Sequence, residues 1–502
     1  MNTRLIQIDS QDTVAIVTEA AKKGEVIDSV TLLSDIPQGH KVALRDMKKG
    51  DAVIRYAVVL GYLVEDVRRG SWINENSLIL PEQPSLSTLT FENPQPVKLP
   101  HPKRTTFEGF ENTHTSYAGT RNILAITTTV QCVSGVVDQV IARIKSELLP
   151  KYPYVDGVVA INHAYGCGVA INAPDAVIPI RSIRNTIKNP NFGGQIMVVG
   201  LGCEKLTVDK LLTEEENTKE NVIILQQYPG YAAMMDALLN MAEAKLKVLN
   251  TRRRTTLPLS KLCVGLQCGG SDAFSGVTAN PSAGYASDLL VSGGATVMFS
   301  EVTEVRDGVH LLAQRCASRE VLDKLVYEID WYDRYLAKGS VDRSANPTPG
   351  NKMGGLSNIV EKAMGSIVKS GKAPIVEVLG PGEIPTKKGL IFAATPASDI
   401  VCGPSQLASG IAVQVFMTGR GTPYGLAEAP VIKVCSRNAM KEQWQDLIDF
   451  DAGLIATKEE TVGQAGERLF NLILDVASGT KPYAEQFGLT NFLCYFNPAP
   501  IT

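Results

Sequence analysis

The sequence contains no long hydrophobic run and no closely paired cysteines. Its 502 residues never supply the roughly 18 to 20 consecutive apolar residues of a membrane-spanning helix, and residues 1–9 are interrupted by polar side chains where a signal peptide needs an apolar core. Nine cysteines are spread along the chain without a Cys-x-x-Cys pair, so we expect neither a zinc ribbon nor a disulfide framework. These absences predict a cytoplasmic protein with reduced thiols and no membrane partner.

An excess of charge and the common cofactor motifs are also missing. The 49 basic and 52 acidic residues give a net charge of −3 and are interspersed, which leaves no basic stripe for nucleic acid. Gly200 and Gly202 begin a dinucleotide-like loop, but Lys205 stands where the third glycine should be. Residues 365–372 have the wrong spacing for a phosphate loop, and no Gly-x-Ser-x-Gly elbow occurs. NAD, ATP, nucleic acid and serine-hydrolase chemistry are therefore not expected.

Four predicted strands each carry a cysteine just beyond their carboxyl end. They are residues 123–130 before Cys132, 155–161 before Cys167, 196–199 before Cys203 and 262–267 before Cys268. Ligands of open parallel sheets bind outside the carboxyl ends of the strands, and thiolates are soft ligands that suit iron, iron–sulfur clusters or zinc. We therefore take the four cysteines as metal-ligand candidates. The alternative is that they are small buried residues at tight strand-to-helix turns.

Acidic and basic side chains near the same strand ends are candidates for proton transfer. His163 is one of five histidines; it is either a base or metal ligand beside a nearby thiol, or a buried structural histidine. Glu204 directly follows a cysteine. Glu301 and Glu304 follow another predicted strand and either act as bases or metal ligands or merely cap the next helix. His40 lies in a turn of the first domain, either solvated or closing over a site elsewhere.

Two glycine-rich loops each carry a cation. Lys352 lies within residues 346–355 and Arg420 within residues 418–425. A tight loop that offers backbone amides and one fixed cation suits carboxylate recognition, whereas the alternative is ordinary turn chemistry. We assign the hydroxyl of Ser271 and the carboxylate of Asp272, which follow a strand end, to the same substrate-binding region.

Hydrophobic patterning predicts an α/β multidomain protein. Residues 1–81 read as short strands with turns, and residues 82–106 form an extended linker rich in proline. Residues 107–254 and 255–502 alternate strands with helices, which indicates a middle α/β domain and a last α/β domain with a mainly parallel sheet. The last domain is predicted to have strands at 262–267, 296–300, 375–379, 390–394, 413–417 and 431–434, and helices at 285–291, 320–338, 356–369, 438–448 and 462–477.

The distinctive segments together resemble the galactarate/altronate dehydratase family from end to end. The matching stretches are residues 36–44, 148–153, 162–174, 200–206, 267–281, 299–307, 344–355, 418–425 and 496–500. Both branches of the family share turns such as Gly39-His40-Lys41 and Cys268-Gly269-Gly270-Ser271-Asp272. The galactarate branch additionally resembles this chain at residues 167–174 and 302–307.

This resemblance implies a β-clip domain of the SAF type, a linker, a middle domain associated with homodimer formation and a Rossmann-like last domain. It also implies an iron-dependent hydro-lyase that converts the sugar diacid galactarate to 5-dehydro-4-deoxy-D-glucarate. Altronate dehydration and non-enzymatic sugar-acid binding are the alternatives. Iron, as Fe²⁺ or a cluster, would be held by some of the four cysteines and His163, with Arg420 and Lys352 on the two carboxylates. The base stays open among His163, Glu204, Glu301 and His40.

Overall fold

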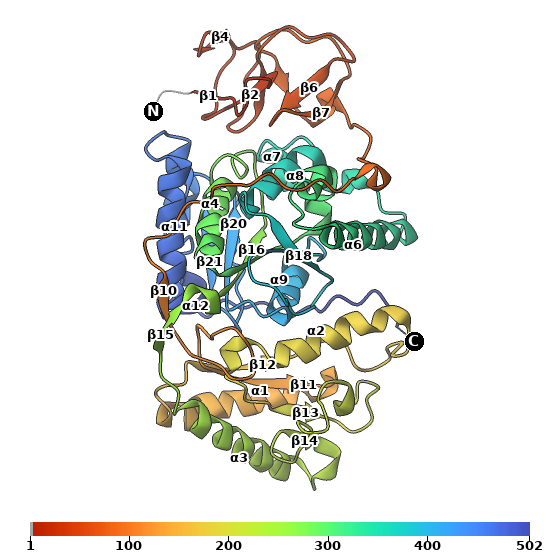
Figure 1. The fold of residues 1–502 in the computed structure, drawn as a ribbon, viewed down its shortest axis with the longest axis vertical. Helices are drawn as coiled ribbons and strands as arrows, with labels where there is room; N and C mark the ends of the chain where they lie inside the picture. The colour runs from red at the N-terminus through yellow and green to blue at the C-terminus, as the bar shows by residue number, and fades with distance from the viewer. Residues whose placement is uncertain (1–3, 502) are drawn as a thin grey trace.

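The structure, a computed structural model, describes residues 4–501 and stacks its domains along one axis. Figure 1 shows the small all-β domain at one end, the C-terminal domain in the centre and the middle domain at the other end. The linker runs across the central domain before the chain reaches the middle domain. The prediction of an α/β multidomain fold is confirmed. No helix among the described residues has both the length and the apolar character that a bilayer crossing requires.

The all-β domain consists of short antiparallel strands. Its four-stranded sheet has the order β1 (Leu5–Ile6), β2 (Val14–Val17), β5 (Lys41–Ala43) and β8 (Trp72–Ile73); a second sheet holds β6 (Ala52–Arg55), β7 (Val58–Leu63) and β9 (Leu78–Ile79), and β3 (Val26–Ile27) pairs with β4 (Val30–Thr31). The apolar side chains of the first sheet, such as Val17 and Val42, form a small separate core. A core of this size gains from docking on a larger domain.

The middle domain is a four-stranded parallel sheet. Its strands lie in the order β12 (Gly157–Ile161), β11 (Ile123–Thr128), β13 (Val198–Gly200) and β14 (Val222–Ile224), and its helices are α1 (Ser134–Arg143), α2 (Val177–Ile187) and α3 (Tyr231–Leu249). One face of α3, including Met235, Leu238 and Leu246, is buried in the core of this domain. The short antiparallel pair β10 (Thr106–Gly109) and β15 (Thr255–Pro258) lies where the chain enters and leaves the domain.

The C-terminal domain is a seven-stranded parallel sheet with helices on its faces. The strand order is β18 (Ile375–Leu379), β19 (Leu390–Ala393), β17 (Thr296–Phe299), β16 (Cys263–Cys268), β20 (Val413–Thr418), β21 (Val431–Cys435) and β22 (Phe450–Asp451). Its helices are α4 (Ala279–Ser292), α5 (Val309–Ala313), α6 (Arg319–Lys338), α7 (Pro349–Met353), α8 (Ile359–Ile367), α9 (Asp399–Ala408), α10 (Asn438–Gln443), α11 (Val462–Ala477) and α12 (Tyr483–Gln486). The expected parallel sheet is therefore present.

The connectivity of this sheet changes direction next to β16, its central strand. The strand that follows it in sequence, β17, lies on one side, whereas β20 lies on the other. Such a switch point opens a crevice at the carboxyl ends of the two strands, where ligands bind in sheets of this type. The loops beyond the two strands are joined, because the backbone N–H groups of Gly419 and Arg420 donate to the Gly270 carbonyl at 3.1 and 2.9 Å.

The all-β domain is fixed over this edge of the sheet by buried charges. Lys41 and Arg55 from the all-β domain both bind Glu361 of α8, at 2.8 and 2.6 Å, and all three side chains are at most 2% exposed. Lys41 also donates to the carbonyl of Gly355, and Arg55 to that of Ala273. Figure 1 accordingly shows the domain lying over α7 and α8.

The linker packs on the C-terminal domain throughout much of its length. Leu86, Leu89 and Phe91 are partly buried against the main apolar core. Arg306 and Arg343 of the C-terminal domain donate to the carbonyls of Pro84 and Pro81. The extended conformation predicted from the prolines is observed, with one short turn at Leu86–Thr88.

Candidate functional site

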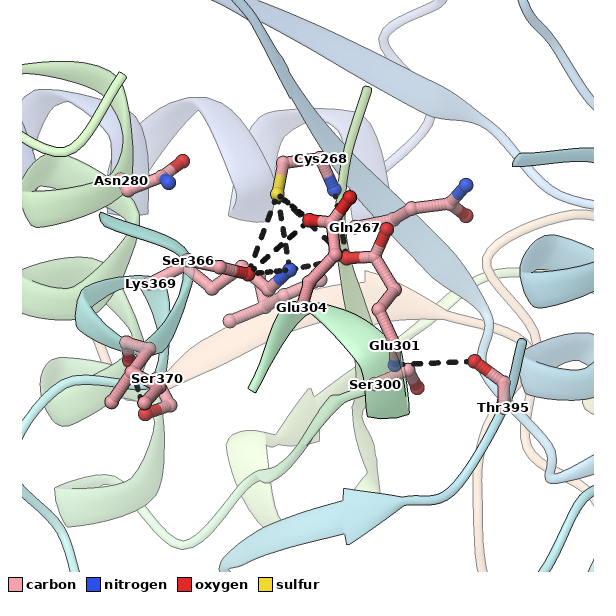
Figure 2. A network of polar contacts seen from close by, with 12 residues as sticks. Gln267, Cys268, Asn280, Ser300, Glu301, Glu304, Ser366, Lys369, Ser370 and Thr395 are labelled. Carbon is pink, nitrogen blue, oxygen red and sulfur yellow. Dashed lines mark hydrogen bonds and ion pairs between the residues drawn. The ribbon is translucent and has the colours of Figure 1, made fainter. Parts of the chain in front are cut away.

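A cluster of buried ionisable side chains lies at the carboxyl ends of β16 and β17. Cys268 is the last residue of β16, Glu301 and Glu304 follow β17, and Lys369 lies in the turn after α8. Figure 2 shows these side chains pointing toward one another, together with Ser366. The Lys369 ammonium lies 3.2 Å from the Cys268 sulfur and also contacts the Glu301 carboxylate. The Cys268 thiol lies 3.3 Å from Glu304 Oε2.

Each carboxyl group of the cluster has its own ammonium partner. Lys362 Nζ lies 2.7 Å from Glu304 Oε1, and Lys369 contacts Glu301. Burial opposes ionisation of Glu304, but Lys362 and Lys369 outweigh it and hold its pKa below the usual range. Burial raises the pKa of the Cys268 thiol, so the sulfur is protonated at neutral pH. Glu304 is therefore the ionised carboxyl group of the cluster, held between Lys362 and Lys369.

Glu301 differs from the other members of the cluster in three respects. Its backbone φ is +80°, a left-handed conformation that a side chain with a β-carbon rarely adopts. Its side chain is fully buried, and Oε1 has no hydrogen-bond partner within the described residues. Burial raises the pKa of this carboxyl group in spite of Lys369. Backbone strain and an unpartnered carboxyl oxygen both cost free energy, and such features gather at functional sites.

The loop after β16 holds Ser271 and Asp272 in different ways. Asp272 is 1% exposed and its carboxylate accepts hydrogen bonds from backbone N–H groups of its own loop and from Ser436, and it pairs with Arg437 at 2.9 Å. This carboxylate is fully engaged in ordering the loop. The carbonyl of Ser271 accepts from Asn351 of α7 at 2.8 Å, which ties the loop to the helix under the all-β domain.

The two predicted carboxylate-binding cations occupy different edges of this region. Arg420 is exposed in the loop after β20, and its backbone N–H contacts the loop after β16. Lys352 of α7 lines a hollow between the C-terminal domain and the all-β domain, together with His40, Trp72 and Glu75. The structure therefore places Lys352 and His40 side by side, and Arg420 on the β20 edge.

His40 holds the two domains together in this conformation. Trp72 donates to its Nδ1 at 3.2 Å, so the ring proton is on Nε2, which lies 3.3 Å from the Met353 carbonyl. Burial lowers the pKa of His40. Both ring nitrogens are thus engaged at the domain interface.

His163 and Glu204 belong to the middle domain and tie its loops together. The ring of His163 is 1% exposed and lies between the carbonyls of Thr128 and Tyr165, at 2.7 and 3.0 Å. Burial lowers the pKa of this ring to about 4, whereas the two carbonyls favour its protonated form, because a neutral imidazole has only one N–H to donate. The Glu204 carboxylate accepts from the Thr129 hydroxyl and from two backbone N–H groups of its own turn. These groups have no free polar atom for proton transfer to a substrate.

The four cysteines are divided between two sheets. Cys132, Cys167 and Cys203 are exposed at the carboxyl edge of the middle sheet, whereas Cys268 is buried in the C-terminal domain. Within residues 4–501, Cys268, Glu301 and Glu304 are the one group of three or more potential ligands whose donor atoms all lie within 4.8 Å of one another. The four predicted thiol ligands thus do not form one site.

Sequence reasoning missed the two lysines of this cluster. Lys362 and Lys369 are seven residues apart in a segment that is otherwise largely apolar, from Ile359 to Ser370. Seven residues are close to two helical turns, so both side chains lie on one face. Two cations on a buried helical face predict carboxylate partners, and this signal was available in the sequence.

Known families match all three domains. The models described as "D-galactarate/Altronate dehydratase, C-terminal", "D-galactarate dehydratase/Altronate hydrolase, second domain" and "Altronate/galactarate dehydratase SAF domain" match residues 259–499, 109–250 and 3–80. The chain belongs to the D-galactarate/altronate dehydratase family. The all-β domain is its SAF domain.

Curated relatives of this dehydratase cover nearly its full length. Galactarate dehydratase (L-threo-forming) of Escherichia coli strain K12 is 56% identical, with 99% of this chain and 97% of that protein covered. Altronate dehydratase of Bacillus subtilis strain 168 is 32% identical, over 94% of this chain and 95% of that protein. The (2R)-sulfolactate sulfo-lyase subunit beta of Chromohalobacter salexigens is 30% identical, over 68% of this chain and 87% of that protein.

Proposed function

We propose that this dehydratase removes water from galactarate and forms 5-dehydro-4-deoxy-D-glucarate. The observation that carries the choice of substrate is the 56% identity to a galactarate dehydratase along the whole chain, against 32% and 30% for two altronate dehydratases. Galactarate has a carboxylate at each end, whereas altronate has one. The substrate site must therefore hold two carboxylates.

The reaction breaks a C–H bond next to a carboxylate and a C–O bond at the neighbouring carbon. Negative charge builds up on that carboxylate when the proton leaves, so cations near it lower the barrier. The departing hydroxide must receive a proton. A site for this reaction needs a proton-transfer group with a pKa near neutrality and at least one buried cation.

We assign proton transfer to Glu301 and charge stabilisation to Lys369. Burial raises the pKa of Glu301, which suits a group that alternately accepts and donates a proton near neutral pH. Its free Oε1 distinguishes it from His40, His163 and Glu204, whose polar atoms are engaged in ordering loops. Lys369 is fully buried beside it. Its charge acts more strongly there than in water, because the buried surroundings have a low dielectric constant.

The substrate enters, in this proposal, between the SAF domain and the carboxyl edge of the seven-stranded sheet. Arg420 in the loop after β20 binds one carboxylate, because a guanidinium can bind both oxygens at once. Lys352 lines the hollow on the SAF side, next to His40, and its ammonium suits the other end of a diacid. Ser271 and the loop ordered by Asp272 form the floor between them.

Iron, as Fe²⁺ or an iron–sulfur cluster, is the proposed cofactor. The donor chemistry of the three exposed thiols in the middle domain fits it, because thiolates are soft ligands and these are free and reachable from solvent. When bound there, iron would supply a Lewis acid for an oxygen ligand at the loops of the middle sheet, apart from the Glu301 cluster. The Cys268 group fits an added cation less well, because Lys369 already provides the positive charge there.

The proposal also extends to the setting of the enzyme. Nine cysteines without a disulfide among the described residues suit a reducing, cytoplasmic environment. The middle domain is the proposed homodimer contact, as the resemblance to the family implies. The interspersed charge offers no basic surface for nucleic acid.

The test is anaerobic turnover of galactarate and of altronate by the iron-loaded enzyme, with the keto-deoxy product followed. We expect product from galactarate, and Glu301→Gln should lower kcat by about 10²- to 10⁴-fold, the usual contribution of a general acid or base. Glu428→Gln is the matched control, since Glu428 is also a buried glutamate with an unpartnered oxygen but lies shortly before β21, at the opposite end of the sheet. It should keep wild-type kcat.

Two outcomes would count against these assignments. Turnover of altronate without turnover of galactarate would overturn the substrate. A folded Glu301→Gln enzyme with unchanged kcat would remove Glu301 from the reaction and leave the substrate assignment standing.

A further inference from the structure

We propose that Cys132, Cys167 and Cys203 together hold an iron–sulfur cluster at the carboxyl edge of the middle sheet, and that Cys268 is not a ligand. The inference rests on the iron requirement proposed above. It adds the place of the cofactor, its three ligands and its chemical class. The three cysteines lie far from Glu301 in the sequence and belong to a different β-sheet.

Sheet topology brings the three thiols to one edge. Strands β12, β11 and β13 are parallel neighbours in that order, and each is followed by a loop with one of the cysteines. The carboxyl ends of parallel neighbours open on the same side of a sheet, so the three loops face the same solvent region. All three cysteines are exposed and free of disulfides, whereas free cysteines in proteins are usually buried.

Buried polar side chains tie the three loops to one another. His163 spans from the Thr128 carbonyl at the end of β11 to the Tyr165 carbonyl, two residues before Cys167. It therefore fixes the loop after β12 against the end of β11. We therefore interpret His163 as a support for the cysteine-bearing loops and not as a base.

Glu204 likewise ties a neighbouring loop to the end of β11, in this case the loop after β13, which lies on the side of β11 opposite β12. Its carboxylate binds the hydroxyl of Thr129, next to β11, and the N–H groups of Leu201 and Gly202 beside Cys203. The carboxylate therefore ties the loop after β13 to the end of β11.

The remaining pair of loops is joined through Gly166. Its carbonyl accepts from the backbone N–H groups of Lys205 and Leu206. A β-carbon on Gly166 would lie 2.1 Å from the Thr129 carbonyl oxygen, so all three loops meet at this residue. Three thiols on mutually fixed loops form a preorganised donor set.

The backbone around the thiols suits a sulfide-containing cluster. Gly166 and Gly168, on either side of Cys167, and Gly202 before Cys203 have positive φ values of 115°, 62° and 123°. Turns of this kind direct backbone N–H groups into a concave surface, as at many iron–sulfur sites. Hydrogen bonds from such N–H groups to cluster sulfurs also tune the reduction potential.

The spacing favours a cluster over a single ion. One tetrahedral metal with bonds of about 2.3 Å to sulfur brings its thiolates within about 4 Å of one another. Among the described residues, the three thiols do not form a group whose sulfur atoms all lie within 4.8 Å. A cluster binds each cysteine through a different iron atom and so tolerates wider spacing. Three cysteines also leave one iron of a four-iron cluster free for an outside ligand.

The test is anaerobic reconstitution of the full-length protein with ferrous ammonium sulfate, sulfide and thiol, followed by iron and sulfide analysis and absorption and EPR spectroscopy. We expect about four iron and four sulfide per chain and the absorption of an iron–sulfur cluster. Cys132→Ser, Cys167→Ser and Cys203→Ser should each lose the cluster signal. Cys268→Ser and Cys494→Ser, the latter a control outside both groups, should keep it.

The readout is independent of turnover, so failure of this proposal and failure of the galactarate assignment can be told apart. Loss of iron in Cys268→Ser alone, or binding of iron without sulfide, would overturn the cluster. Retention of the full signal in all three middle-domain variants would overturn the site. Circular dichroism and thermal melting of each variant show whether a lost signal reflects unfolding.

Discussion

The protonation state of each buried carboxyl group in this chain follows from its partners. Glu304 has two lysines nearby and a lowered pKa, whereas Glu301 has one and a raised pKa. Glu428 is fully buried without a cation beside it, one oxygen has no partner in the described structure, and burial raises its pKa to about 7. A carboxyl group whose pKa is raised by burial destabilises the folded protein when it ionises. At a site away from the chemistry, such a shift is therefore not a sign of function.

This cost predicts a pH-dependent effect of Glu428→Gln. A folded-state pKa of about 7, against the ordinary value of 4.5 for a glutamate side chain, makes the wild type lose stability as the pH rises from about 4.5 through 7. The shift corresponds to about 3 kcal/mol above pH 7. Glu428→Gln cannot ionise, so it should be more stable than the wild type at pH 8 by up to that amount, with a smaller difference at pH 5. Urea unfolding midpoints at the two pH values measure this; a difference that does not change with pH would contradict the account.

At the scale of elements, the sequence predicts the long strands and helices of the C-terminal domain and misses the short or small-residue ones. β22 has two residues, too few for any periodicity. α9 contains Pro404 and several small or polar buried residues, which hide its helical pattern. α4 begins at Ala279, six residues before the predicted start, because its first turns carry small side chains that allow close packing.

The candidate sites were predictable only in part, because the sequence shows local positions but not contacts between distant segments. The position of a cysteine at each strand end can be read from local sequence, and the sheet edges then follow from general topology. The predicted domain boundary at residue 254 already separates Cys268 from the other three thiols. Contacts between distant segments are not visible in the sequence, so the meeting of Cys268 with Glu301 and Glu304 could not be predicted. The same holds for Lys369, which meets Cys268 across 101 residues of sequence.

The loops of the middle domain yield a prediction at Gly166. This residue has a φ of +115°, and a β-carbon there would clash with the Thr129 carbonyl at 2.1 Å. Gly166→Ala should therefore destabilise the protein by at least about 1–3 kcal/mol, the usual cost of such backbone strain. Gly135→Ala is the matched control, since Gly135 lies in α1 with no atom within 4 Å of the added carbon, and alanine favours a helix. Thermal melting compares them, and equal melting temperatures for the two variants would refute the steric argument.

At the scale of the whole molecule, the SAF domain and the C-terminal domain act as one unit because of a buried charge cluster between them. Lys41 and Arg55 have no other carboxylate partner among the ion pairs of the described residues than Glu361. Removal of one partner of a buried ion pair is far more damaging than loss of a surface pair, since the remaining charges stay desolvated. The hollow that holds His40 and Lys352 exists only while this docking persists.

Glu361→Gln should therefore release the SAF domain. It leaves two buried cations without a counter-charge, which costs about 3–5 kcal/mol, more than a small interface between domains readily supplies. We expect faster proteolytic cleavage in the linker at residues 82–106 and faster hydrogen exchange in β5, with the C-terminal sheet still protected. Lys22→Met is the matched control, because it removes a solvent-exposed pair with Asp35 in the same domain and should leave both rates unchanged. If Glu361→Gln and Lys22→Met are cleaved at the wild-type rate, the buried charges do not hold the domains together, and the packing of the linker residues Leu86, Leu89 and Phe91 must do so instead.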